Sequence, residues 1–158
     1  MEVSFHLIPI QNSNHRLVRE IYADAICSQG LELYNQDQID AWSALAFLPG
    51  VLDEPLNKGT GWFVNIGNDS EAFAIRYPTN RLALLYCRGR SARKGYATNL
   101  LIQIEHDARE QGIKILYTEA SLFSYLLLLK HEWTCKSVDE IKIAGVSFLI
   151  YRMFKRLY

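Results

Sequence analysis

The sequence is poor in cysteine, and the positions of the few that occur exclude the two common structural uses of this residue. The chain of 158 residues contains three cysteines, Cys27, Cys87 and Cys135, which lie far apart. They form no C-x-x-C pair or cluster with histidine, and their number is odd, so we expect neither a zinc site nor a disulfide framework. We therefore expect no metal.

The sequence also lacks an excess of charge and a long apolar run. Seventeen basic and seventeen acidic residues give a net charge of +0, so no overall field would attract nucleic acid or an anionic membrane. The longest apolar run, Leu82 to Cys87, is far shorter than the roughly 20 residues of a membrane-spanning helix. The N-terminal residues do not resemble a signal peptide. We therefore expect a cytoplasmic protein without a membrane or nucleic-acid partner.

The hydrophobic pattern predicts one α/β domain with a mixed sheet over residues 1–158. Its predicted element order is β-α-α-β-β-β-α-β-α-β-β. Alternating or continuous apolar residues predict strands at 3–10, 61–66, 71–77, 81–87, 113–120, 133–143 and 146–157. Helical spacing or composition predicts helices ending near Gly30 and at 34–48, 95–111 and 122–131, with 49–61 as a loop.

The strand at 81–87 is apolar on both faces, which predicts a central strand. With the helix from Gly95 and the strand at 113–120, it forms a β-α-β unit, for which we expect a parallel pair of strands. In such a unit, ligands bind beyond the carboxyl ends of the strands. The loop after Cys87 is therefore the first place to look for a site.

That loop, within "CRGRSARKGYATNLL", carries Arg88, Arg90, Arg93 and Lys94 at the start of a predicted helix. Cations are disfavoured at a helix N-terminus, by roughly 0.3–1 kcal/mol each, whereas anions are favoured. The unpaired amides of the first turn, with a glycine at position 95, would suit a polyphosphate placed between amides and cations. Neither the P-loop pattern nor the dinucleotide fingerprint matches. The residues alone leave a solvated basic loop or an RNA-contacting patch as alternatives.

A resemblance to a known family favours the phosphate interpretation. The segment Ala92-Arg93-Lys94-Gly95-Tyr96-Ala97 resembles the [QR]-x-x-G-x-[GA] acetyl-coenzyme A (acetyl-CoA) loop of the GNAT superfamily of N-acetyltransferases, with alanine at the first position. The segments "YNQDQIDAW", "TEAS" and "GVSFLIYRMFKRL" are similar to those of small bacterial YafP-like acetyltransferases. The resemblance implies a GNAT-like fold, acetyl-CoA as cosubstrate and an amine acceptor, in a monomer or homodimer.

The resemblance also implies roles for individual residues. Glu119 is the expected general base. Leu128 stands where the family has a tyrosine acid, so Tyr125 is the nearest substitute, while Ser121 and Glu132 also depart from the family pattern. The expected cofactor-binding residues are Leu85, Tyr86, Cys87, Arg88, Arg90, Arg93, Lys94, Gly95, Tyr96, Ala97 and Thr98, and the expected acceptor pocket contains Tyr34 and Trp42.

Three functions follow from these observations. The first is transfer of an acetyl group from acetyl-CoA to a primary amine of a small molecule or peptide by direct attack. The second, kept open by the departures at Ala92, Ser121, Leu128 and Glu132, is a domain that binds an acyl-CoA without turnover. The third is a small nucleic-acid-binding protein that uses the basic loop 88–94, which the neutral net charge disfavours.

Overall fold

The computed structural model describes residues 4–158, so Val3, at the start of the first predicted strand, lies outside the described part. The strands are β1 (Phe5–Pro9), β2 (Thr60–Ile66), β3 (Asp69–Arg76), β4 (Leu82–Cys87), β5 (Ile115–Ala120), β6 (Thr134–Ile143) and β7 (Val146–Arg156). The helices are α1 (His15–Gln29), α2 (Gln36–Ser43), α3 (Asp53–Lys58), α4 (Tyr96–Glu110) and α5 (Leu122–Lys130). The mixed α/β order is confirmed, with α3 added.

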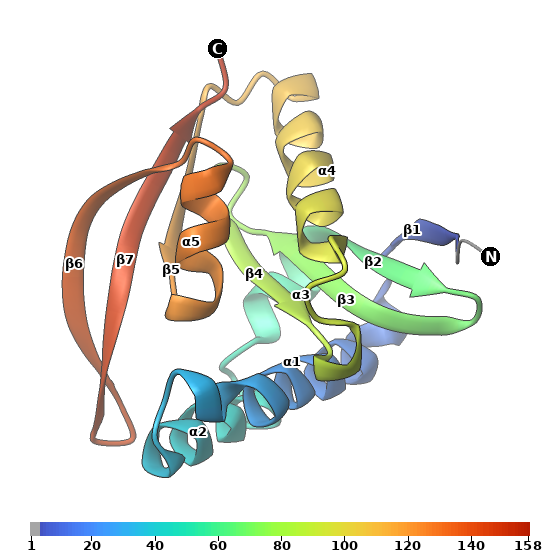
Figure 1. The fold of residues 1–158 in the computed structure, drawn as a ribbon. Helices are drawn as coiled ribbons and strands as arrows, with labels where there is room; N and C mark the ends of the chain where they lie inside the picture. The colour runs from blue at the N-terminus through green and yellow to red at the C-terminus, as the bar shows by residue number, and fades with distance from the viewer. Residues whose placement is uncertain (1–3) are drawn as a thin grey trace.

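The strands form two sheets that separate at β4 (Figure 1). One sheet has the order β1-β2-β3-β4 and the other β5-β7-β6, and all pairs within them are antiparallel. The expected parallel contact between β4 and β5 is a single bridge from Arg81 to Tyr117, beyond which the strands diverge. The prediction of a central position for β4 was therefore wrong, because β4 is the last strand of its sheet. Its sequence is apolar on both faces because helices cover both faces.

The apolar residues of the first sheet divide between two cores on opposite faces. Phe63 and Phe73 pack with α1 on one face, whereas Val64 and Ala72 pack with α4 on the other. Neighbouring residues of a strand point to opposite faces, so a strand covered on both sides has no polar alternation. This double cover explains the continuous apolar run that β4 shares with β3.

The helix α3 lies in the segment that the sequence predicts to be a loop. Pro55 is its third residue, and a proline in the first helical turn removes no hydrogen bond. Asp53 and Glu54 suit the positive end of the helix, and Lys58 pairs with Glu54 one turn later at 3.2 Å. The glycines on both sides of α3 are typical of loops, and they obscured the helical pattern between them. Within residues 4–158, no helix is long and apolar enough to cross a membrane.

Candidate functional site

The edge of β4 that faces away from β3 carries backbone groups directed into the gap between the two sheets. The N–H of Arg88 donates to the carbonyl of Glu71 at 2.8 Å, and hydrogen-bonded pairs alternate along antiparallel strands. Tyr86 therefore bonds to β3, whereas Leu85 and Cys87 direct their N–H and C=O groups into the gap. The carbonyl of Cys87 accepts a hydrogen bond from Gln29 Nε2 at 2.7 Å.

The first of two hollows at this edge, the loop cleft, has a volume of about 670 Å³. It is lined by Ala25, Gln29, Glu32, Leu33, Leu85, Tyr86, Cys87, Ser91, Ala92, Arg93, Gly95, Tyr96, Ala97, Thr98, Leu122, Phe123, Ser124, Leu126, Leu127 and Lys130. These residues come from α1, the turn after it, β4, the basic loop, the start of α4 and the whole length of α5. Eight of the eleven predicted cofactor-binding residues are among them, and Arg88, Arg90 and Lys94 are not.

The N-terminus of α4 opens into the loop cleft. The earliest backbone bond of this helix is donated by Asn99 to the Gly95 carbonyl at 3.1 Å, so the amides of residues 96–98 precede the helical ladder. Gly95 has φ 87°, a left-handed conformation that favours glycine, and nothing lies within 4 Å of where a Cβ would be. The cleft therefore offers backbone amides without an intrahelical partner, the positive end of the helix dipole and free space, and these three features fit a phosphate group.

Two of the four cations in the loop have a partner inside the protein, which sequence reasoning did not predict. Arg90 binds the buried carboxylate of Glu71 through two nitrogens, at 2.7 and 2.6 Å, and Ser91 Oγ donates to the same carboxylate at 2.6 Å. Arg88 Nε donates to the carbonyl of Ser70 at 3.0 Å and lies 3.7 Å from Glu71. The hydrogen bonds from Arg90 lower the pKa of Glu71 despite its burial. Arg88 and Arg90 thus hold the loop in place.

The other two cations are exposed and lie nearer the helix. Arg93 adopts φ 61° and pairs with Glu32 at 3.1 Å, with both side chains largely in solvent. Exposed pairs of this kind contribute about 0–1 kcal/mol, so this contact does not compete strongly with a ligand. Lys94 is exposed beside them, and Lys130 at the end of α5 lines the cleft from the far side. The sequence pattern did not indicate Lys130, because it lies far along the chain.

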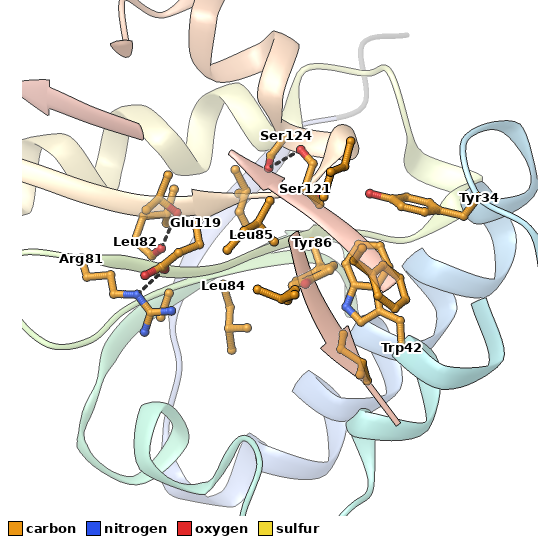
Figure 2. Close-up of a pocket in the computed structure, with 17 residues that line it drawn as sticks. Tyr34, Trp42, Arg81, Leu82, Leu84, Leu85, Tyr86, Glu119, Ser121 and Ser124 are labelled. Atoms are coloured by element: carbon orange, nitrogen blue, oxygen red, sulfur yellow. Dashed lines mark hydrogen bonds and ion pairs between the residues drawn. The ribbon is translucent and has the colours of Figure 1, made fainter. Parts of the chain in front are cut away.

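The second hollow, the aromatic pocket, has a volume of about 300 Å³ (Figure 2). It is lined by Tyr34, Trp42, Arg81, Leu82, Ala83, Leu84, Leu85, Tyr86, Thr118, Glu119, Ser121, Ser124, Ile141, Ile143, Phe148, Leu149 and Ile150. The two residues predicted to line an acceptor pocket, Tyr34 and Trp42, are in contact, with ring centroids 5.3 Å apart.

Aromatic side chains form one end of this pocket. Trp42 also packs against Phe148 and Tyr86, with ring centroids 6.1 and 6.3 Å apart. Tyr34 Oη accepts a hydrogen bond from the N–H of Leu122 at 3.0 Å, and burial raises the pKa of Tyr34. The pKa of Tyr86 is raised well above its usual value by burial, so both phenols stay neutral. This end is therefore aromatic and uncharged.

The other end of the pocket contains an ion-pair network. In Figure 2, Arg81 and Glu119 lie at the end opposite Tyr34 and Trp42. Glu119 accepts a hydrogen bond from Arg81 Nε at 2.7 Å and lies 3.7 Å from Arg152, which also pairs with Asp139. The carboxylate of Glu119 is therefore flanked by two guanidinium groups. Glu119 thus lies in the pocket as expected, but in a setting that the sequence did not predict.

The two hollows meet at the open edge of β4. Leu85, Tyr86 and Ser124 line both of them. Ser124, in the first turn of α5, brings a hydroxyl to this junction, and it is a residue that sequence reasoning missed. Tyr125 lines neither hollow, because its ring stacks on Tyr151 with centroids 4.1 Å apart. This packing disfavours the acid role expected for Tyr125.

The segment after α5, which departs from the family pattern in sequence, contains a residue with a positive φ. Glu132, which occupies the position of the family's glycine, has φ 70°, and Leu128 is 1% exposed. A positive φ favours glycine, so Glu132 holds a strained conformation there. Within residues 4–158, no group of three or more His, Cys, Asp or Glu side chains is placed to hold a metal ion.

Comparison of the fold with solved structures identifies its type. A GCN5-related N-acetyltransferase from Rhodopseudomonas palustris superposes with a TM-score of 0.90 at 20% sequence identity, covering 99% of this chain and 98% of that one. The chain has the GCN5-related N-acetyltransferase (GNAT) fold. The GNAT fold predicted from the sequence is thus confirmed, while the narrower resemblance to YafP-like proteins stays a prediction. No family model matches the chain, and no curated protein matches it by sequence.

Two further GNAT structures were solved with a ligand. PaiA N-acetyltransferase from Thermoplasma acidophilum, in complex with coenzyme A, has a TM-score of 0.76 at 12% identity, covering 97% of this chain and 99% of that one. YncA from Salmonella typhimurium, with its cofactor acetyl-CoA, has a TM-score of 0.68 at 14% identity, covering 98% and 95%. At these identities the likeness concerns the fold alone.

Proposed function

We propose that the chain is an N-acetyltransferase that moves the acetyl group of acetyl-CoA to a primary amine by direct attack. The observation that carries this proposal is the meeting of two hollows at Leu85, Tyr86 and Ser124 on the open edge of β4. One hollow has the features of a phosphate site, and the other is a smaller pocket of about 300 Å³ with an aromatic end. The ligands of PaiA and YncA support acetyl-CoA as the occupant of the loop cleft.

In this proposal the loop cleft binds the cosubstrate mainly through the backbone. The amides of residues 96–98 and the dipole of α4 bind the pyrophosphate, with Arg93, Lys94 and Lys130 nearby. The backbone groups of Leu85 and the N–H of Cys87 in the gap pair with the pantetheine arm, whereas the carbonyl of Cys87 is bonded to Gln29. Arg88 and Arg90 are left out of the binding set, because Glu71 already holds them.

The chemistry then consists chiefly of positioning at the junction. The amine nitrogen attacks the thioester carbonyl carbon, the new C–N bond forms, and the C–S bond breaks to release coenzyme A. The ammonium must lose a proton before attack, and Glu119 is the carboxylate in the aromatic pocket that is placed nearest to this task. Ser124 supplies a hydroxyl beside the departing sulfur, and it replaces Tyr125 in our assignment.

The test has two stages. Calorimetric titration with acetyl-CoA measures binding, and a thiol-release assay with a panel of amines measures turnover. Binding with turnover supports the proposal, binding without turnover supports an acyl-CoA-binding module, and absence of binding contradicts both. That module remains the second candidate, because the carboxylate of Glu119 already has Arg81 and Arg152 as partners and Tyr125 is packed away from the junction.

Single substitutions separate the assigned roles. Glu119→Gln should lower kcat far more than it changes the Kd for acetyl-CoA, since Glu119 lines only the aromatic pocket. Ser124→Ala should lower kcat by about tenfold, which is less than the roughly 10²–10⁴-fold of a full general acid, because a thiolate is a tolerable leaving group. Tyr125→Phe on the same helical turn is the matched control, and it should keep full activity. A loss of activity in Tyr125→Phe with none in Ser124→Ala would reverse this assignment.

A further inference from the structure

We infer that the acceptor is a small, singly charged amine carrying an aromatic or branched apolar body, and not a polyamine or another polycation. This inference rests on the proposed function and names the substrate class of the same site. It is drawn from the shape, the wall and the charge of the aromatic pocket.

The wall of the pocket is apolar where a substrate body would lie. Trp42 and Phe148 form one end, at 7% and 5% exposure, and their rings keep an edge-on arrangement. The β6–β7 hairpin adds Ile141 and Ile143, which are partly buried against the same core. Aromatic and aliphatic surfaces bind apolar groups through the area they remove from water, at roughly 25 cal/mol per Å². A polar body that lies against Ile141, Ile143 and Phe148 would lose hydration without gaining hydrogen bonds from these side chains.

The size of the pocket limits that body. A volume of about 300 Å³ lies at the low end for small-molecule sites, which hold roughly 300–1,000 Å³. It suits one ring and a short chain. A polyamine is longer and carries several ammonium groups, so at least one of them would lie against the apolar side chains of the pocket.

The charge of the pocket excludes a second ammonium group. Among the described residues of the lining, Glu119 is the one acid, and it is bound by Arg81 and Arg152. With Asp139, which pairs with Arg152, these groups form a network of two cations and two anions. A network without net charge gives little attraction for a polycation, whose desolvation would stay uncompensated.

The two ends of the pocket also set the orientation of the acceptor. The junction with the loop cleft lies at Leu85, Tyr86 and Ser124, so the reacting nitrogen must reach this point. The aromatic end at Trp42 lies apart from Glu119 in Figure 2, which leaves the apolar body on the side of the rings. The amine therefore points toward Ser124, with a short linker to the ring.

The first experiment compares 2-phenylethylamine with spermidine at saturating acetyl-CoA. We expect kcat/KM for 2-phenylethylamine to be at least tenfold higher, as is usual when a pocket matches an apolar group. Calorimetry with both amines in the presence of coenzyme A measures the same preference without turnover. Equal or reversed preference in both measurements would overturn the inference. A protein that binds 2-phenylethylamine beside coenzyme A but never releases thiol would contradict the proposed function and leave the inference standing.

The second experiment places a carboxylate in the wall. Ile141→Glu should lower kcat/KM for 2-phenylethylamine by about tenfold and raise the relative rate with spermidine, because the pocket gains an unpaired negative charge. Val138→Glu lies on the same strand, is 51% exposed and does not line the pocket, so it is the matched control and should change neither rate. An unchanged ratio in folded Ile141→Glu, or the same change in Val138→Glu, would contradict the inference.

Discussion

The loop cleft and the aromatic pocket share the edge of β4 but are built in different ways. Eight of the twenty residues that line the loop cleft come from one continuous segment, Cys87–Thr98, which supplies the open backbone amides and the helix dipole. The aromatic pocket collects side chains from α2, β4, β5, α5 and the β6–β7 hairpin. A backbone site depends on the conformation of a few residues, whereas a side-chain site depends on the packing of the whole domain.

We expect the largest difference between the two hollows from a single substitution in the loop cleft. Gly95→Glu should raise the Kd for coenzyme A by about 100-fold or more, because it places a negative charge in the open space before α4 and strains a φ of 87°. Isothermal titration calorimetry measures the change.

Gly112→Glu, at the other end of α4, is the matched control. It has φ 76° and equally open space, so it shares the cost of a positive φ without approaching the cleft. Both variants should lose thermal stability, Gly112→Glu by slightly more because its carboxylate lies at the negative end of the α4 dipole, and only Gly95→Glu should lose affinity. Wild-type affinity in a folded Gly95→Glu would place coenzyme A elsewhere.

The next effect concerns stability. Glu71→Gln should lower the free energy of unfolding at neutral pH by about 2 kcal/mol, since it breaks charged hydrogen bonds to Arg90 and Ser91. Because the pKa of Glu71 is lowered in the folded state, its contribution is present above the unfolded value of about 4.3 and is lost as the pH falls through the lower folded value. The difference from wild type should therefore shrink below about pH 4.

Urea unfolding at pH 7 and pH 3.5 measures this difference. Glu140→Gln, on an exposed position of β6, is the control and should change stability little at either pH. A difference for Glu71→Gln that stays constant between the two pH values would show that the carboxylate charge is not what holds the loop.

A smaller effect separates the two kinds of cation in the loop. Replacing both Arg93 and Lys94 with glutamine should weaken coenzyme A binding by about three- to tenfold and leave the melting temperature equal or slightly higher, because exposed cations there oppose the dipole of α4. Calorimetry and thermal unfolding without ligand check the two parts. A marked loss of melting temperature would show that Arg93 or Lys94 is structural, as Arg90 is.

The smallest expected effect lies at the rim of the aromatic pocket. Leu149→Ala should raise KM for the acceptor only about two- to threefold, because this side chain is 52% exposed. It should leave the Kd for coenzyme A unchanged, because Leu149 lines the aromatic pocket and not the loop cleft. Steady-state kinetics and calorimetry on one preparation measure both. A change in cofactor affinity would contradict the separation of the two hollows.

The difference between the hollows also explains how far the sequence could predict the site. Gly95 and the amides after it were predictable, because the helix start and its small residues are local in the chain. The fold was predictable from periodicity and resemblance together. The partner of Arg90 was not, because Glu71 lies nineteen residues away on another strand and its burial has no local signal. Ser124, Lys130 and Ile141 were missed for the same reason.

Two local patterns gave a wrong or an incomplete result. The apolar run of β4 correctly predicts that both faces of this strand are covered by other elements. It does not predict which strands pair with its two edges, and β4 lies at the end of its sheet. Tyr125 was chosen by its distance in sequence from Leu128. Its ring stacks on Tyr151 because a helix that packs on a sheet directs successive residues to different sides.

The β6–β7 hairpin has a consequence for how such a domain can diversify. It supplies Ile141, Ile143, Phe148, Leu149 and Ile150 to the aromatic pocket, and none of its described residues lines the loop cleft. Drift in this hairpin would therefore alter the choice of acceptor while the acyl donor stays the same. Related chains that keep the loop before α4 but differ in the hairpin would then form a lineage with one donor and many acceptors. A redesign of acceptor specificity could therefore exchange the β6–β7 hairpin and leave the rest of the domain unchanged.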